Sequence, residues 1–509
     1  MTLLGVDIGT TGCKVAAVGL DGSVPATAYR EYPLATPQPG WAELDPDGVW
    51  NAVCGAISEV TAAVAEPPRA LAVATLGEAV TPIDASGAAL APTIVSFDGR
   101  AGACYEQLVA ALGAERLTAV CGVAPQPHYS VAKWRWIARE MPETYRRAAT
   151  LACFGDLCAV RLGLPPVIDH TMATRTLAFD ATGDCWSSEI LDAAGVDVEK
   201  LPTPAPTGTV VGAVAAQQAR DLGLAEGALL VTGGLDQACA AYGAGIGAGG
   251  GGSAMLSLGT VAVLAAILRT DRSVLASVPT VPYLEPGTRL AVAGTPAGGA
   301  VLRWYRDRFG AAEAAVPGGI GTEGEFYDRI VAGVADVETD LIALPHFGGS
   351  RTAFSDPQAT AALVGLTFAT ERRHIVRALL EGVALETAVM AEQLAAAGAP
   401  VTSLRAVGGG SRSAVWMQIF ADVLGIPVDS TAGADAAAIG AALIAGAATG
   451  MVPRERRSLS VVMRCEPEDS RRGRYRSTLE RYRVLHGALA AARNADSPRH
   501  TGGERGVAT

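Results

Sequence analysis

The sequence predicts an α/β protein built from two similar domains that face each other. Apolar runs of strand length, such as residues 229–232 and 404–407, alternate with helical stretches such as residues 372–395, which is the pattern of an α/β architecture. An approximate internal repeat is the second observation, because two local patterns occur once in each half of the chain. Two halves that carry the same units indicate two related domains.

The composition is that of a folded, Ala/Gly-rich protein. A length of 509 residues suggests two or three domains with a sizeable core. Half of the residues are apolar and only 18% are charged, which argues against a disordered chain. Acidic residues outnumber basic ones, 51 to 40, so duplex nucleic acid is not expected as the main partner.

Several features indicate a cytoplasmic protein. The nine cysteines are odd in number and scattered without CxxC pairs, which predicts free thiols in a reducing compartment. Met1 is followed almost at once by the apolar run 3–8, without a basic region or a cleavage site, so we expect no secretory signal. The uncharged stretch 238–268 contains many glycines and three hydroxyl residues, and we expect a helix end, a linker and a strand there, with no membrane span.

The first repeated unit is a strand, a Gly-Thr turn and a second strand. It occurs at residues 3–18 and again at residues 254–268. Such a turn exposes backbone N–H groups and hydroxyls that suit phosphate oxygens. Asp7 ends the first strand, and a carboxylate buried there needs a cation or donors, which Mg²⁺ held through water would supply. For one turn alone, an ordinary hairpin with a structural Asp explains the pattern better, but two turns from opposing domains can grip the β- and γ-phosphates from both sides.

The second repeated unit is a strand followed by glycines and a helix. Residues 229–236 end in Asp236 at the start of a helix, and residues 404–411 contain Gly408-Gly-Gly-Ser. A carboxylate at Asp236 can accept a proton from a substrate hydroxyl, or it can simply cap its helix. The three glycines allow close approach to a nucleotide, or they make a tight turn.

The Gly-rich stretch 243–252 is the expected boundary between the halves. We therefore expect an N-terminal domain at 1–245, a C-terminal domain at 246–490 and a disordered tail at 491–509, where the sequence becomes polar and loses periodicity.

Eight motifs in order resemble the FGGY carbohydrate kinases, the group of xylulokinase and glycerol kinase within the actin/hexokinase/Hsp70 ATPase superfamily. They lie at residues 5–11, 39–46, 97–100, 233–237, 257–260, 344–352, 380–384 and 408–416. The resemblance covers nearly the whole chain. It implies two RNase H-like domains with a cleft between them, and ATP and Mg²⁺ as cofactors.

The resemblance also implies roles for individual residues. Asp236 matches the general base and Asp7 the carboxylate near magnesium. The implied nucleotide contacts are Thr10, Thr11, Lys14, Gly259, Thr260, Gly299, Gly409, Gly410 and Ser413.

The expected substrate segment departs from both named relatives. Leu76-Gly77-Glu78-Ala79 lacks the Met-His of xylulokinases and the Arg of glycerol kinases, whereas Gln237 after the base resembles glycerol kinases. Glu78 can accept hydrogen bonds from two hydroxyls, unless it is a surface residue at a strand end. Gly77 in place of a bulky residue should leave room for a longer substrate than glycerol. We therefore expect Gly77, Glu78, Asp236 and Gln237 to bind a ketose or polyol of about pentose size.

The functional hypothesis is ATP-dependent phosphorylation of a sugar or polyol hydroxyl in a cleft that closes over the reactants. The alternatives are a glycerol kinase-like or gluconokinase-like enzyme, a non-catalytic sugar sensor and a chaperone-like ATPase. The expected partners are the small-molecule acceptor and ATP; a homodimer is one option for the oligomeric state, which the sequence does not determine. Trp41 and Trp136 are expected to be packing residues, and the six histidines show no metal-binding spacing.

Overall fold

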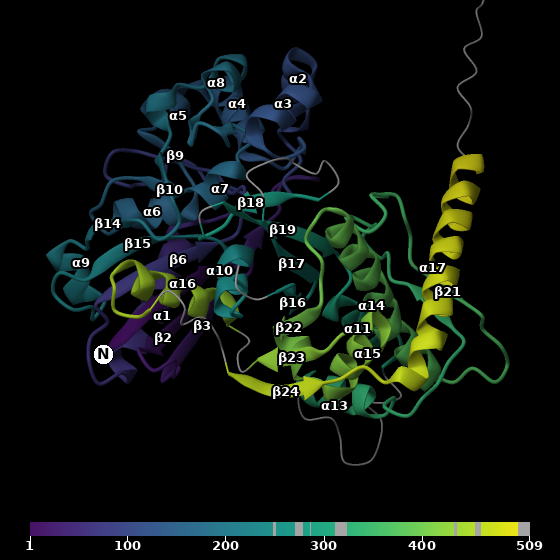
Figure 1. Ribbon diagram of the computed structural model, residues 1–509. Coiled ribbons are helices and arrows are strands. Elements are labelled where there is room, and N and C mark those ends of the chain that lie inside the picture. The colour runs from purple at the N-terminus through teal and green to yellow at the C-terminus, as the bar shows by residue number, and fades with distance from the viewer. Residues whose placement is uncertain are drawn as a thin grey trace, which may run out of the picture.

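The computed structural model contains two large mixed β-sheets, each covered by helices (Figure 1). It describes residues 1–247, 251–269, 278–285, 287–310, 323–431, 435–453 and 460–496. Among these residues, no helix is both long enough and apolar enough to cross a membrane. The expected linker 243–252 lies between a helix that ends at residue 243 and a strand that begins at residue 253. Its residues 248–250 lie outside the described residues.

The first sheet has the strand order β14-β15-β6-β1-β2-β3. In that order its strands are β14 (Val210–Ala213), β15 (Leu229–Leu235), β6 (Ala70–Thr75), β1 (Thr2–Ile8), β2 (Gly12–Gly19) and β3 (Ala26–Glu31). β1 and β2 form an antiparallel hairpin, and β6 and then β15 add in parallel beside β1. Every residue of β6 is buried, because helices or loops cover both faces of the central strands.

The second sheet repeats this arrangement with the order β18-β19-β17-β16-β22-β23-β24. Its strands are β18 (Thr280–Pro282), β19 (Thr288–Thr295), β17 (Ala262–Arg269), β16 (Ser253–Leu258), β22 (Ser403–Val407), β23 (Val428–Thr431) and β24 (Val461–Cys465). β16 and β17 form the hairpin, and β22 and then β23 add in parallel beside β16. The predicted duplication and the two predicted hairpins are therefore present.

The topology corrects the second expected match between the halves. The repeat predicts that residues 229–236 match residues 404–411, but β22 holds the position of β6, and β23 holds that of β15. A strand followed by glycines and a helix occurs at more than one position of each sheet, so the local pattern could not distinguish the third strand from the fourth. The consequence is that the loop after β6 corresponds to the Gly-rich turn after β22.

Two helices lie between the sheets and join them into one core. α10 (Asp236–Gly243) follows β15, and α16 (Ala436–Ala448) follows β23. They share a hydrophobic cluster with both sheets, including Val231 of β15 and Met255 of β16. The helices touch through glycine, since a Cβ atom on Gly440 would lie 1.8 Å from the Cys239 carbonyl oxygen. α16, which lies in the expected C-terminal range, also packs on β1, where a Cβ atom on Gly5 would lie 1.7 Å from the Ala438 carbonyl oxygen.

The remaining helices before α10 form the outer layer of the first sheet and a helical subdomain that the sequence did not predict (Figure 1). They are α1 (Pro46–Ala63), α2 (Gly102–Leu112), α3 (Ala114–Cys121), α4 (Ser130–Glu140), α5 (Pro142–Arg147), α6 (Phe154–Arg161), α7 (His170–Thr174), α8 (Ser188–Ala194), η1 (Val198–Lys200) and α9 (Ala216–Asp221). The short strands of this half are β4 (Leu34–Ala35), β5 (Glu43–Leu44), β7 (Thr81–Ile83), β8 (Thr93–Ile94), β9 (Thr150–Ala152), β10 (Val167–Asp169), β11 (Phe179–Asp180), β12 (Cys185–Trp186) and β13 (Thr203–Ala205).

The second half adds α11 (Gly299–Phe309), α13 (Glu323–Ala332), β20 (Ile342–Leu344), β21 (Ala362–Val364), α14 (Arg372–Ala396), η2 (Gly409–Arg412), α15 (Ala414–Leu424) and α17 (Asp469–Asp496). The helix predicted at residues 372–395 is confirmed as α14. The expected disordered tail needs a correction at its start, because α17 remains helical through Asp496. Tyr475 and Tyr482 pack into the core and anchor this polar helix. The sequence beyond residue 490 shows no apolar periodicity, so it did not indicate that the helix continues there. Residues 497–509 of the expected tail lie outside the described residues.

Candidate active site

Asp236 lies at the junction of β15 and α10, and glycines set the backbone there. The register between β15 and β6 shifts between Thr232 and Gly234, and Gly234 has a φ of 152°, which favours glycine. The backbone N–H of Leu235 donates a buried hydrogen bond of 2.8 Å to Thr171 Oγ1 in α7. The bulge and this hydrogen bond fix the residue that immediately precedes Asp236.

The carboxylate of Asp236 is half-buried and does not cap α10. Leu235 is the N-cap residue, and no side-chain cap bond exists there among the described residues. Asp236 Oδ1 accepts a 2.7 Å hydrogen bond from the adjacent Gln237 N–H. Burial raises the pKa of Asp236 to about 6; Glu78 adds to the rise, while Arg175 opposes it. The geometry thus disfavours the helix-cap alternative and leaves a carboxylate whose pKa suits proton transfer near neutral pH.

Asp7 is close enough to Asp236, Lys14 and Asp435 for their charges to change its pKa. Asp7 is the register partner of Lys14 across the β1–β2 hairpin. Burial raises the pKa of Asp7 to about 7, with further increases from Asp236 and Asp435 and a decrease from Lys14. Lys14 Nζ forms an ion pair with Asp435 Oδ1 at 3.2 Å. The structure therefore brings together three of the expected site residues and one that the sequence analysis missed.

Asp435 could have been found from the repeat. It is the N-cap residue of α16, just as Asp236 opens α10, and the two helices follow corresponding strands. The incorrect pairing of residues 229–236 with residues 404–411 hid this correspondence. The two carboxylates therefore occupy matching positions in the two halves.

The donor set around Asp7 fits a hydrated Mg²⁺ ion. Among the described residues, no group of three or more His, Cys, Asp or Glu side chains could hold a metal ion alone. Mg²⁺ in phosphoryl-transfer enzymes usually keeps several waters and uses one or two carboxylates together with the phosphates of its substrate. A half-buried carboxylate with a second carboxylate nearby meets that requirement, and Asp7 would be its ligand.

Burial of Asp7 leads to a prediction about stability and pH. The ordinary pKa of 3.8 rises to about 7 in the folded chain, so folding favours the protonated form. Ionisation of Asp7 therefore lowers the free energy of unfolding progressively as the pH increases from 3.8 to about 7. In chelator-treated buffer without nucleotide, Asp7→Asn should melt at a higher temperature than the wild type at pH 8.

This difference should shrink as the pH falls towards 4, because Asp7 is then protonated in the folded wild type and increasingly so in the unfolded chain. Thermal melts at several pH values check the trend. A variant that melts at or below the wild-type temperature at pH 8 would contradict the account of Asp7 as a desolvated carboxylate.

The first hairpin turn presents its threonines to the solvent. The Gly9 N–H donates to the Gly12 carbonyl oxygen at 3.0 Å, and Tyr32 Oη donates to the Gly9 carbonyl oxygen at 2.6 Å. Thr10 is half-buried and Thr11 is exposed at the top of this turn. These hydrogen bonds hold the backbone of the turn, and the exposure of Thr11 leaves this end of the turn accessible to a ligand.

The second hairpin turn rests on the N-terminus of α11. Gly259 and Thr260 are exposed, and their carbonyl oxygens accept hydrogen bonds from the Gly299 N–H at 2.7 Å and the Ala300 N–H at 3.1 Å. Gly298 must be glycine, since a Cβ atom there would lie 2.5 Å from the Val261 carbonyl carbon. Gly259, Thr260 and Gly299 are therefore neighbours, as the resemblance implied.

The Gly-rich turn after β22 lies beside the same hairpin. Gly408 has a φ of 89°, and a Cβ atom there would lie 2.9 Å from the carbonyl oxygen of Leu258, the last residue of β16. A Cβ atom on Gly409 would meet no described atom within 4 Å, while one on Gly410 would lie 2.7 Å from the Leu258 side chain. Ser413 Oγ accepts a 3.2 Å hydrogen bond from Trp416 N–H and caps α15, so this hydroxyl has a structural partner.

The predicted residues thus form two groups. One contains Asp7, Lys14 and Asp236, and the other surrounds the end of β16 with Gly259, Thr260, Gly299 and the glycines after β22. That the two groups face each other across a cleft stays a prediction.

Glu78 is not a surface residue at a strand end, so that alternative is wrong. It follows β6 with a φ of 60°, an uncommon backbone conformation for a non-glycine residue, and its side chain is only 6% exposed. Glu78 forms an ion pair with Arg175, and Glu78 Oε1 lies 3.9 Å from His128 Nε2. A buried carboxylate held at an unusual φ is consistent with a binding residue.

Gly77 does not leave the expected space. A Cβ atom on this residue would lie 3.2 Å from Leu235 Cδ1 and 3.7 Å from Arg175 Nε. Side chains from β15 and the end of α7 therefore occupy the region beside Gly77, and the argument for a longer substrate from an empty volume fails. Sequence analysis could not foresee this, because Arg175 is far from Gly77 along the chain.

Arg175, His128 and Lys133 are polar residues of this region that the sequence analysis missed. Burial lowers the pKa of His128 to about 4 and that of Lys133 to about 8. Lys133 donates to the His128 carbonyl oxygen. α4 also carries Arg135, Arg139 and Glu140, so no sequence signal singled out Lys133 as the buried cation.

Trp41 and Trp136 pack within the protein as expected. The Arg100 guanidinium lies 3.7 Å from the centre of the Trp41 ring, and the Trp136 ring meets Trp41 edge-on at 5.6 Å. Arg100 also forms ion pairs with Asp98 at 2.7 Å and Glu43 at 2.8 Å. These contacts occupy the Trp41 ring with groups of the chain itself.

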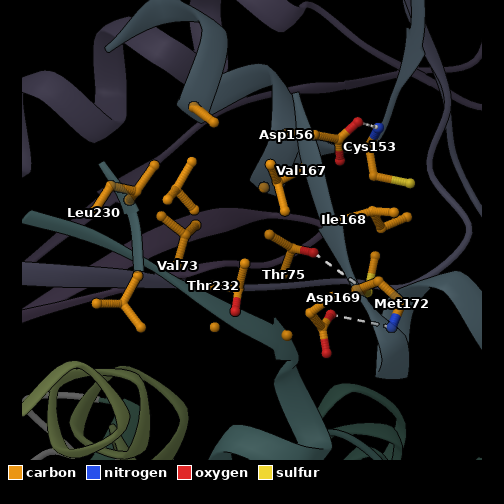
Figure 2. A pocket seen from close by; sticks show the side chains of 16 residues that line it. Val73, Thr75, Cys153, Asp156, Val167, Ile168, Asp169, Met172, Leu230 and Thr232 are labelled. Atoms are coloured by element: carbon orange, nitrogen blue, oxygen red, sulfur yellow. Dashed lines mark hydrogen bonds between the residues drawn. The ribbon is translucent and has the colours of Figure 1, made fainter. Parts of the chain in front are cut away.

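A pocket of about 30 Å³ lies among residues of β6, α6, β10 and β15, in the first half of the chain. Figure 2 shows Thr75, Thr232 and Asp169 around it, with Asp169 bonded to the Met172 N–H. Asp169 also accepts from Thr171 N–H and Thr207 Oγ1, and it caps α7. The residues that line this pocket all belong to the first half of the chain.

The fold and these groups define an ATP-dependent phosphotransferase with an alcohol as acceptor, and comparison with known proteins identifies the family. The model of the FGGY family of carbohydrate kinases, N-terminal domain, matches residues 2–243, and that of the C-terminal domain matches residues 254–449. The chain belongs to the FGGY family of carbohydrate kinases.

Individual relatives cover most of the chain. A glycerol kinase from Gloeobacter violaceus is 30% identical over 454 residues, 88% of each chain. A xylulose kinase from Escherichia coli is 28% identical over 446 residues, 87% of this chain and 89% of that one. The crystal structure of a xylulose kinase from Rhodospirillum rubrum has a TM-score of 0.84 and 29% identity, covering 97% of this chain and 99% of that chain.

Proposed function

We propose that this FGGY kinase transfers the γ-phosphoryl group of ATP to a hydroxyl of a ketose or polyol of about pentose size. Its similarity to both glycerol and xylulose kinases supports an acceptor within that range. The position of Asp236 is the observation that carries the proposal: a half-buried carboxylate with a pKa raised to about 6, fixed by a glycine bulge, beside Glu78 and Arg175.

Asp236 accepts the proton of the attacking hydroxyl in this mechanism, and the freed oxygen attacks the γ-phosphorus. Glu78 and Gln237 orient the acceptor so that its hydroxyl points towards Asp236. Thr10 and Thr11 in the first turn, and Gly259 and Thr260 in the second, hold the phosphates in line through hydroxyl and backbone donors.

Three further groups complete the nucleotide site. Asp7 would hold Mg²⁺ through water, and the bound ion would supply positive charge against the phosphates, to which Lys14 adds its own. Gly299, Gly409 and Gly410 approach the nucleotide through their backbone, and Ser413 holds the first turn of α15 beside them. An ATP-dependent reaction and nine free cysteines support a cytoplasmic location.

An acceptor panel tests the proposal. Wild-type protein with ATP and Mg²⁺ is assayed for ADP release with pentuloses, hexuloses, polyols and aldonates, and each positive reaction is checked for a phosphate monoester. We expect acceptor-dependent ADP release with at least one ketose or polyol. Tight ATP binding without acceptor-dependent turnover anywhere in the panel would instead favour the non-catalytic sensor.

A further inference from the structure

Arg175 carries a half-buried guanidinium in the proposed substrate region. It caps the C-terminus of α7, and its side chain is 18% exposed. Arg175 Nε lies close to the backbone that leads into Glu78, since a Cβ atom on Gly77 would be in ordinary van der Waals contact with it at 3.7 Å. Arg175 thus reaches, from a distant element, the loop that follows β6.

The two terminal nitrogens of Arg175 have partners among the described residues, whereas Nε has none there. Nη2 pairs with Glu78 and lies 3.4 Å from His128 Nε2, and Nη1 lies 3.4 Å from Tyr129 Oη. The guanidinium carbon also lies 4.9 Å from the centre of the Tyr129 ring. In the described structure, Arg175 Nε is nonetheless a buried atom without a hydrogen-bond partner. A buried donor of this kind costs free energy unless another group accepts from it.

A second unpartnered buried atom lies on the residue after the base. Gln237 Oε1 has no hydrogen-bond partner in the described structure, although the Gln237 N–H is bonded to Asp236. Leu235 links the two places, because it contacts the Gly77 position and precedes Asp236 and Gln237. The unsatisfied donor therefore belongs to a residue that interacts electrostatically with the candidate base, and the unsatisfied acceptor belongs to the residue after it.

The hydrogen-bond donors and acceptors of these groups indicate which functional groups a ligand must carry. Glu78, Asp236 and Gln237 Oε1 offer acceptors, whereas Arg175 Nε offers a donor and His128, its pKa lowered by burial, adds no charge at neutral pH. Hydroxyl groups can satisfy both kinds of atom, because each one accepts and donates. A carboxylate can accept from Arg175, but it cannot donate to any of the three acceptors and is repelled by two of them.

From this geometry we propose that Arg175 is a specificity-determining residue, which donates from Nε to one substrate hydroxyl while other hydroxyls donate to Glu78 and Gln237. The site then selects neutral polyhydroxy compounds over aldonates. This inference rests on the proposed function and narrows its acceptor class.

The first experiment measures binding as well as turnover. Isothermal titration of the wild type with xylulose, glycerol, ribitol and gluconate should give binding for at least one neutral compound and at least about tenfold weaker binding for gluconate. Preferred binding of gluconate, or no binding of any neutral compound, would overturn the inference. Binding of a neutral compound without its phosphorylation would reject the proposed function and leave the assignment of Arg175 standing.

The second experiment separates a binding role from a structural one. Arg175→Lys keeps a positive charge opposite Glu78 but removes Nε, so we expect KM for the best acceptor to rise at least about tenfold, with KM for ATP unchanged. The matched control is Arg116→Lys, since Arg116 forms an exposed ion pair with Glu189 in the same half of the chain. Full rescue by lysine would show that Arg175 only supports Glu78, and it would overturn the proposal.

Deoxy analogues of the best acceptor provide the sharpest readout. One analogue should lose at least about tenfold in kcat/KM with the wild type but little with Arg175→Lys, because the lost hydroxyl and the lost Nε are partners. If every analogue loses the same factor in both proteins, the contact does not exist. Arg175→Gln alone leaves Glu78 buried without a counter-charge, so the double variant Glu78→Gln/Arg175→Gln serves as the neutral comparison. This double variant should bind the neutral acceptors weakly and without the wild-type order of affinities. An unchanged order of affinities would refute the proposal.

Discussion

Asp236→Asn should reduce acceptor-dependent ADP release by about 10³-fold while leaving the affinity for ATP within a few-fold of wild type. Asparagine keeps the shape of the side chain, and its Oδ1 can still accept the Gln237 N–H bond, so the bulge and α10 should persist. What is lost is the group that takes the hydroxyl proton. Steady-state kinetics with the best acceptor and an ATP titration check the two halves of this expectation.

Asp192→Asn is the matched control for this substitution. Asp192 is exposed on α8, outside both groups of candidate site residues, and its replacement should leave turnover unchanged. If Asp236→Asn retained near-normal turnover, Asp236 would not be the base. Parallel loss of ATP binding would instead indicate that the substitution disturbs the nucleotide site.

Gly440→Ala should destabilise the protein by at least about 3 kcal/mol, because it separates the two helices that join the sheets. A Cβ atom on Gly440 would lie 1.8 Å from the Cys239 carbonyl oxygen and 3.0 Å from the Gly243 nitrogen. These neighbours are backbone atoms of α10, so they cannot move away without shifting the helix that begins with Asp236. Urea unfolding, with turnover measured on the folded fraction, checks the prediction.

A second helical glycine provides the control for helix propensity. Gly487 lies in α17, and a Cβ atom there would meet no described atom within 4 Å. Gly487→Ala should be neutral or stabilising by up to about 1 kcal/mol, as expected for alanine in an exposed helix. Equal effects of the two substitutions would contradict close packing of α10 against α16.

The parts of the fold that depend on local sequence could be predicted. Each Gly-Thr turn is flanked by two apolar strands, so both central hairpins were visible, and the repeat of this unit implied two related halves. The position of Asp236 at a strand end followed from the glycines before it. These features arise from residues that are neighbours in the chain.

The parts that depend on distant residues could not. Nothing near Gly77 indicated that Arg175 would fill the adjacent space, and nothing near residue 440 indicated that α16 would pack against α10 and β1. The helical subdomain was missed because its short helices are stabilised by mutual packing of scattered apolar residues, such as Trp134 and Leu177, and show no long periodic pattern. Asp435 was missed because the repeat was aligned with the wrong strand.

The most direct test of the central claim follows phosphorus during one reaction. Wild-type protein, ATP, Mg²⁺ and the best acceptor from the panel are monitored by ³¹P NMR until the ATP is consumed. We predict that ADP and a new phosphate monoester appear in equal amounts, and that Asp236→Asn produces neither over the same period. Release of inorganic phosphate with ADP, and no ester, would contradict transfer to an acceptor hydroxyl.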